Sequence, residues 1–169
     1  MIGMMGSGKS TVGKSLSKKM NWKFIDCDLE IEKVEKCSIN EIFKIGENKF
    51  RKLETEKIHE LKDSNKTIFS TGGGIVLNDK NYDLLSKSFC IYLKTSVSEI
   101  LNRIGDDESR PLIKGNKLEV LSNIERERIS LYDSLANLII NTDDKTITEI
   151  CNLIAVSYTH LTLPTIHRV

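Results

Sequence analysis

The chain has 169 residues, of which 39% are hydrophobic and 29% are charged, and its formal net charge is +1. This length and composition predict one soluble globular domain with a buried core. The small net charge argues against a nucleic-acid partner, and the sequence shows neither an apolar run of bilayer length nor a secretory signal. The four cysteines are far apart and lack metal-ligand spacing, so we expect free thiols in a cytoplasmic protein.

Taken in chain order, short apolar segments alternate with segments of helical periodicity. The expected helices are residues 9–20, 38–46, 47–63, 96–104, 117–131 and a last helix from Thr146. The expected strands are residues 22–26, 67–71, 89–94 and 135–141. Three helix starts carry a capping box, in which Ser or Thr is followed three residues later by Glu: Ser38, Ser96 and Thr146. This alternation predicts an α/β fold in which helices cover both faces of a parallel sheet. Residues 105–116 are polar, with two glycines and one proline, and are predicted to be a mobile loop.

The first residues, MIGMMGSGKST, contain the pattern Gly-x4-Gly-Lys-Ser of a phosphate-binding loop. Glycines let backbone N–H groups turn toward phosphates, and the start of the following helix adds its positive dipole end. Lys9 is expected to reach the β- and γ-phosphates, and the Ser10 hydroxyl to ligate Mg²⁺. The predicted ATP contacts come from the loop and the first helical turn: Gly6, Ser7, Gly8, Lys9, Ser10 and Thr11. The alternative is a chance match in a glycine-containing turn.

The stretch FIDCD places Asp26 and Asp28 two residues apart. On a strand, this spacing would put both carboxylates on one face, at the edge of the sheet where ligands bind. One could hold Mg²⁺ through water while the other accepts a proton from an attacking hydroxyl. The alternative is that Asp28 only caps the helix that follows it.

Three consecutive glycines, Gly72, Gly73 and Gly74, follow the strand expected at 67–71. They cost conformational entropy, and a simple turn does not require them. We expect this backbone to approach a ligand closely, with a flexible loop as the alternative.

Together these motifs resemble those of the shikimate kinases, a family of small P-loop kinases in aromatic amino acid biosynthesis. The resemblance runs from about residue 2 to about residue 154 and depends on the order of GMMGSGKST, FIDCD, IFKIGENKFRKLE, STGGG, RPL and RISLY. It implies ATP-dependent, Mg²⁺-assisted phosphorylation of the shikimate 3-hydroxyl. It also implies a three-layer P-loop kinase fold with a five-stranded parallel sheet, a substrate-binding region at about 29–63 and a lid at about 105–117.

The resemblance implies roles around the transferred phosphoryl group. Asp28 would bind the acceptor hydroxyl and act as the base, with Lys9 as a further catalytic residue. Asp26 and Ser10 would hold Mg²⁺. Arg110, in the lid, would reach the transferred phosphoryl group.

The resemblance implies further roles around the two substrates. Arg51 and Arg128 would clamp the shikimate carboxylate as bidentate donors, beside the backbone of Gly73 and Gly74. Glu54 lies three residues after Arg51 and could orient it. Arg103 would lie near the adenine of ATP.

Other functions stay open at this point. By spacing alone, Arg51 and Arg128 lie in mixed-charge runs typical of solvated helix faces. The chain could instead be another small kinase, such as a gluconate kinase, or a nucleotide-binding module without catalysis. Asp28, Lys9 and Arg110 argue for the enzyme. We expect a monomer that binds shikimate and ATP.

The two ends of the chain differ from this pattern. Only two residues precede Gly3, so we expect the strand before the phosphate loop to be truncated and the chain to be less stable than an extended version. Residues 1–155 are predicted to form the kinase domain. Residues 156–169 contain no Asp, Glu or Lys and are predicted to be a non-native or disordered tail.

Overall fold

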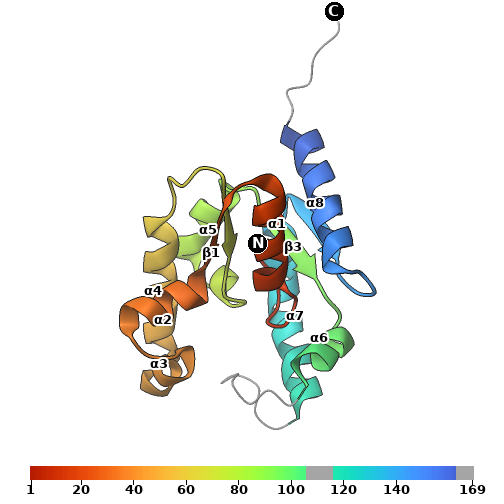
Figure 1. Cartoon of the computed structure of the whole chain (residues 1–169). Helices are drawn as coiled ribbons and strands as arrows, with labels where there is room; N and C mark the ends of the chain where they lie inside the picture. Colours follow the sequence, from red (N-terminus) through yellow and green to blue (C-terminus); the bar gives the residue numbers. More distant parts are fainter. Residues whose placement is uncertain (106–115, 163–169) are drawn as a thin grey trace, which may run out of the picture.

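The computed structural model describes residues 1–105 and 116–162 (Figure 1). Most of the predicted mobile loop, including Arg110, lies outside the described residues, as do residues 163–169.

Helices and strands alternate along the whole described chain. The helices are α1 (Lys9–Met20), α2 (Cys27–Glu35), α3 (Ile39–Ile45), α4 (Glu47–Glu60), α5 (Asp79–Ser86), α6 (Val97–Ile104), α7 (Lys117–Leu135) and α8 (Ile147–Thr162), with one 3₁₀ turn, η1 (Ile75–Leu77). The strands are β1 (Lys23–Asp26), β2 (Thr67–Ser70), β3 (Ile91–Lys94) and β4 (Leu138–Asn141). Each expected helix and strand is present within a few residues, whereas α5 was not predicted and α2 was expected only as the helix that Asp28 would cap. The sequence of α5 is mostly polar, and its start is a side-chain cap in which Asn78 accepts from the Lys80 N–H.

Two of the three predicted capping boxes form, at Ser38 and Thr146, whereas at Ser96 the hydroxyl accepts from the Glu99 N–H but the Ser96 N–H donates to Asp143. The Ser38 hydroxyl accepts from the Glu41 N–H, and the Glu41 carboxylate accepts from the Ser38 N–H. Thr146 and Glu149 make the same reciprocal pair at the start of α8. These local bonds satisfy N–H groups that no helix can satisfy internally, and so they determine where the helices begin.

The strands form two parallel pairs, β1 with β2 and β3 with β4. Met1 and Ile2 lie between these pairs. The Ile2 N–H donates to the Ile91 carbonyl at 2.9 Å, and the Met1 ammonium donates to the Phe69 carbonyl at 2.6 Å. The described residues therefore do not form the predicted continuous five-stranded sheet. Only two residues precede Gly3, and they give a single bridge, between Ile2 and Tyr92, instead of a ladder.

Helices cover both faces of the strands (Figure 1). Because side chains alternate along a strand, Ile91 and Leu93 pack toward α1 and α8, whereas Cys90 and Tyr92 pack toward the opposite side, with α6 and α7. A third, smaller apolar cluster joins α2, α3 and α4 through Ile31, Ile42 and Phe50. The predicted arrangement of helices on both faces is confirmed.

Helix α8 continues through Thr162, past the point where a tail was predicted to begin. The ring of Tyr158 packs edge-on against Trp22 at 5.2 Å and against Phe89 at 5.0 Å between centroids. The prediction of disorder was therefore wrong for residues 156–162, because composition does not reveal that this aromatic side chain reaches the core.

Candidate active site

The phosphate loop turns directly into helix α1. Gly8 precedes the helix with φ of 90°, a left-handed conformation that favours glycine. The Lys9 ammonium donates to the carbonyls of Gly3 at 2.9 Å and Met4 at 2.8 Å, so it lies inside the loop. A cation and a helix N-terminus thus meet at one point, which is the arrangement that binds phosphate.

Arg103 links the phosphate loop to the residue that follows strand β4. Its guanidinium donates to the Ser7 carbonyl at 3.4 Å and to the Thr142 carbonyl at 3.0 Å, and Glu99 holds its Nε at 2.8 Å. This places Arg103 on the side of the phosphate loop that α6 covers.

The interpretation of Asp26 and Asp28 as strand neighbours was wrong. Strand β1 ends at Asp26, and Asp28 lies in the first turn of α2. The capping role belongs to Asp26, whose Oδ1 accepts from the N–H groups of Asp28 and Leu29. The strand ends at Asp26, as expected for residues 22–26, and the local cap places Asp28 on the following helix instead of on the face of the strand.

A carboxylate and two hydroxyls of the kind that bind Mg²⁺ lie next to one another beside the phosphate loop. Asp26 is the register partner of Ser70 across β1 and β2, and the Ser70 hydroxyl lies 3.1 Å from the Ser10 hydroxyl. Mg²⁺ usually takes one or two carboxylates and hydroxyls and keeps waters and phosphates as its other ligands. The donor types therefore fit this ion, although no cluster of three or more His, Cys, Asp or Glu exists among residues 1–105 and 116–162.

The three glycines lie in crowded surroundings: Gly72 and Gly74 face charged side chains, and Gly73 faces the backbone of the phosphate loop. A Cβ on Gly72 would collide with the Glu54 carboxylate and lie 3.1 Å from Asp28 Oδ1, and one on Gly74 would collide with the Arg51 guanidinium. None of the three has a positive φ, so space rather than backbone freedom explains them. The groups that approach this backbone are the protein's own, and the expected approach to a ligand stays a prediction.

Arg51 is held by two carboxylates on its own helix. It pairs with Glu54 at 2.5 Å and with Glu47 at 2.8 Å, and its side chain is only 15% exposed. The predicted orienting role of Glu54 is therefore matched by a direct ion pair. The expectation from charge pattern alone, a solvated arginine, was wrong because α2 and α3 pack over this face of α4.

Arg128 and Tyr132 lie one helical turn apart on α7, and Tyr132 reaches the glycine turn. Arg128 is 4% exposed, and its Nε makes no hydrogen bond among the described residues but lies 3.8 Å from the Glu127 carboxylate. Tyr132 is fully buried, and its hydroxyl donates to the Gly73 carbonyl. The spacing of four residues puts both side chains on one face of the helix.

Burial shifts the acids of this cluster toward their neutral forms. It raises the pKa of Asp28 to about 6, with the neighbouring charge of Asp26 as the second cause. It also raises the pKa of Glu54 to about 7, against the opposing effect of Arg51. Asp28 Oδ1 and Glu54 Oε1 are both buried without a protein partner among the described residues.

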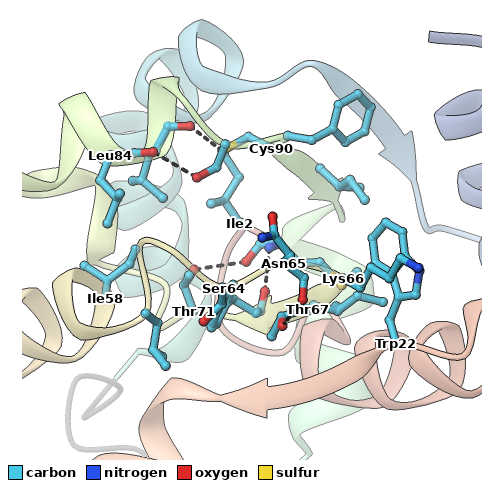
Figure 2. Close-up of a pocket in the computed structure, with 18 of the residues that line it drawn as sticks. Ile2, Trp22, Ile58, Ser64, Asn65, Lys66, Thr67, Thr71, Leu84 and Cys90 are labelled. Atoms are coloured by element: carbon cyan, nitrogen blue, oxygen red, sulfur yellow. Dashed lines mark hydrogen bonds between the residues drawn. The ribbon is translucent and has the colours of Figure 1, made fainter. Parts of the chain in front are cut away.

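A separate cavity of about 390 Å³ lies at the amino ends of β2 and β3 (Figure 2). Met1, Trp22, Thr67, Phe89 and Tyr158 are among the residues that line it, and none of the predicted site residues does. Since the phosphate loop and the charged cluster lie at the opposite ends of these strands, we do not assign catalysis to this cavity.

Two further findings concern the wider chain. All four cysteines are free, as predicted, and three of them are buried. No helix in the described ranges 1–105 and 116–162 is long and apolar enough to span a bilayer.

Comparison with known proteins decides the family. The family model for shikimate kinase matches residues 5–158. A shikimate kinase of Clostridium botulinum (strain 657 / Type Ba4) is 43% identical over 148 residues, covering 85% of this chain and 86% of that protein. The chain belongs to the shikimate kinase family. Its activity is accordingly that of a kinase acting on shikimate.

Solved shikimate kinases share the fold closely. The enzyme of Acinetobacter baumannii, solved in complex with shikimate, is 31% identical and superposes with a TM-score of 0.93 over 96% of this chain and 93% of that one. The enzyme of Aquifex aeolicus is 35% identical, with a TM-score of 0.83 and 96% coverage of both chains. The resemblance first inferred from motif order is confirmed.

Two residues of this shikimate kinase site were missed as contributors by sequence reasoning. Ser70 bonds the Ser10 hydroxyl, and Tyr132 bonds the triple-glycine turn. The four-residue spacing of Arg128 and Tyr132 was visible as a signal. Nothing in the sequence signalled the contact of Ser70, because it joins segments 60 residues apart.

Proposed function

We propose that this chain transfers the γ-phosphoryl group of ATP to the 3-hydroxyl of shikimate, with its acceptor site at the triple-glycine turn. One observation supports this most strongly. Beside the phosphate loop, the Arg51 guanidinium packs on Gly74, and Asp28 Oδ1, buried without a partner among the described residues, lies against Gly72. The buried Arg128 lies one helical turn from Tyr132, whose hydroxyl bonds the Gly73 carbonyl. The arrangement suits a small acceptor that carries both a carboxylate and hydroxyl groups.

The carboxylate of shikimate would bind between Arg51 and Arg128. Burying a guanidinium N–H without a hydrogen bond costs free energy, which an anionic ligand can offset through charge-assisted hydrogen bonds. Arg128 Nε is such a donor, because the Glu127 carboxylate lies 3.8 Å from it, too far for a hydrogen bond. Arg51 is already positioned by Glu47 and Glu54, so little side-chain entropy would be lost when it binds the ligand.

The acceptor hydroxyl would bind Asp28. Its Oδ1 lies against Gly72, free to accept a hydrogen bond, and its raised pKa keeps it a usable base near neutral pH. The backbone N–H groups of Gly73 and Gly74 would complete the contacts to shikimate.

The triphosphate would bind at the loop. Lys9, with the backbone of Gly6, Ser7 and Gly8 and the first turn of α1, would neutralise and orient its phosphates. Ser10 and Asp26 would hold Mg²⁺, which offsets negative charge on the phosphates when bound. Arg103 would lie at the adenine end. Arg110 lies outside the described residues, and its role at the transferred phosphoryl group stays a prediction. Thr11 would contact ATP.

The remaining proposals concern the whole chain. Residues 1–155 would act as one kinase domain whose sheet places Met1 and Ile2 as the central member of five strands, as the hydrogen bonds to Phe69 and Ile91 suggest. We propose a monomeric cytoplasmic enzyme with no nucleic-acid or membrane partner.

The reaction is tested by ADP release with ATP and Mg²⁺, with shikimate and gluconate as parallel acceptors. We expect release that depends on shikimate and is near background with gluconate. Equal release with both acceptors, or none with shikimate, would contradict the proposal.

The carboxylate clamp is tested by Arg51→Ala, with Lys52→Ala as the matched control. Lys52 is the next residue on α4, and its side chain is 78% exposed. We expect Arg51→Ala to raise the KM for shikimate about ten- to hundredfold, the range for losing charged hydrogen bonds, and to leave the KM for ATP within about twofold. Lys52→Ala should change neither. Equal effects of Arg51→Ala on both substrates would count against the clamp.

A further inference from the structure

We propose that Tyr132 is a positioning residue that fixes the triple-glycine turn relative to Arg128, so that both can bind the acceptor. This inference rests on the carboxylate clamp proposed above. The observation behind it is the hydrogen bond from the Tyr132 hydroxyl to the Gly73 carbonyl, which crosses from α7 to a segment 59 residues earlier in the chain.

The bond fixes one peptide plane of the turn. A trans peptide is planar, so its carbonyl and the following N–H point in opposite directions. With the Gly73 carbonyl held by Tyr132, the Gly74 N–H must point away from α7. Gly74 is the residue whose missing side chain makes room for the Arg51 guanidinium. A carboxylate bound by Arg51 would therefore lie close to this N–H.

The bond also ties α7 to the turn on which Arg51 of α4 packs. Arg128 lies one helical turn before Tyr132 on the same face, while Arg51 packs on Gly74. Tyr132 thus links the helix that carries one arginine to the turn on which the other rests. Loss of this link would remove one direct connection between the two arginine-bearing parts of the site.

The tyrosine itself has little freedom to move. Its ring is fully buried and stacks on Tyr92, with centroids 5.0 Å apart and an angle of 29° between the planes. Burial raises its pKa, so the phenol stays protonated and remains a donor over the working pH range. A rigid donor of this kind can hold a carbonyl in one place.

The test is Tyr132→Phe, which removes the hydroxyl and keeps the ring. We expect the KM for shikimate to rise about three- to tenfold, as for the loss of one ordinary hydrogen bond, with the KM for ATP unchanged within about twofold. Tyr92→Phe is the matched control, since it removes a hydroxyl from the stacked partner without touching the turn. It should leave both constants unchanged.

A second control separates positioning from stability. Leu135→Ala removes a buried α7 side chain that makes no bond to the turn, so it should lower the melting temperature without splitting the two KM values. All variants are assayed below their melting transitions, at low temperature if Tyr132→Phe requires it. An unchanged shikimate KM in Tyr132→Phe, or an equal rise in Leu135→Ala, would overturn the inference. If Arg51→Ala also left the shikimate KM unchanged, the clamp itself would be at fault.

Discussion

At the scale of single residues, burial decides which groups can react. Cys27 lies between two aspartates, yet burial raises its pKa to about 12, so its thiol stays protonated and is a poor nucleophile. The same burial raises the pKa of Asp28 only to about 6, which leaves most of its carboxylate ionised at neutral pH. Of these neighbours, Asp28 is the one suited to accept a proton.

This difference predicts the pH dependence of activity. A base works in its ionised form, so kcat/KM should rise as the pH increases through about 6 and level off above it. Asp28→Asn should lower kcat by about 10²- to 10⁴-fold, the range for losing a positioned base. The measurement is a pH–rate profile at saturating Mg²⁺ and ATP.

Glu32→Gln supplies the control for this profile. The charge of Glu32 contributes to the raised pKa of Asp28, and its Oε1 accepts from the Ile39 N–H, a bond that an amide oxygen can keep. Removing the charge should move the acid limb to slightly lower pH without loss of the plateau. A profile that stays flat well below pH 6 would show that Asp28 does not control the rate.

At the scale of elements, local chemistry predicted most of the fold, whereas tertiary packing decided the details of the site. Capping boxes at Ser38 and Thr146 are read within four residues, so their helix starts could be placed from sequence. The end of β1 at Asp26 was also predicted, but the start of α2 was not, because Asp26 serves both as a strand residue and as the cap of the helix. The burial of Arg51 and Arg128 was equally hidden, since neighbouring elements cover them.

The double use of Asp26 predicts that its two roles can be separated. Asn caps a helix about as well as Asp, whereas Ala does not, so Asp26→Ala should be less stable than Asp26→Asn by about 1 kcal/mol. Both variants lose the carboxylate, so both should need more Mg²⁺ for half-maximal activity. Thermal melts and Mg²⁺ titrations of the two proteins check this. Equal melting temperatures would remove the capping role, and an unchanged Mg²⁺ requirement would remove the metal role.

At the scale of the whole molecule, the two strand pairs are joined through very little backbone. Met1 and Ile2 bond to β2 on one side and to β3 on the other, and the cavity of about 390 Å³ continues this line toward the amino ends of both strands (Figure 2). Burial lowers the pKa of the Met1 ammonium, which shows that a charged group at this place is unfavourable. An uncharged, apolar group at this junction between the two strand pairs should therefore stabilise the fold.

An apolar extension placed before Met1 should stabilise the chain. In a parallel strand the N–H and C=O of one residue face the same neighbour, so the N–H groups of Phe69 and Ile91 point toward the path such an extension would take. Two buried Val or Ile residues would contribute about 1.5–3 kcal/mol each, less about 1–2 kcal/mol each for ordering the backbone, for a net gain of about 2 kcal/mol. For a chain of this size, the melting temperature should rise by roughly 4–8 °C.

A Gly-Ser extension of equal length is the control, because it also converts the buried ammonium into an amide but adds no apolar surface. Trp22 lines the cavity and is the chain's one tryptophan, so its fluorescence reports directly on filling. The apolar extension should shift its emission to shorter wavelength, whereas the Gly-Ser extension should not. Equal melting temperatures for the two extended proteins would show that the cavity does not limit stability, and that packing across α1 and α8 already holds the two strand pairs together.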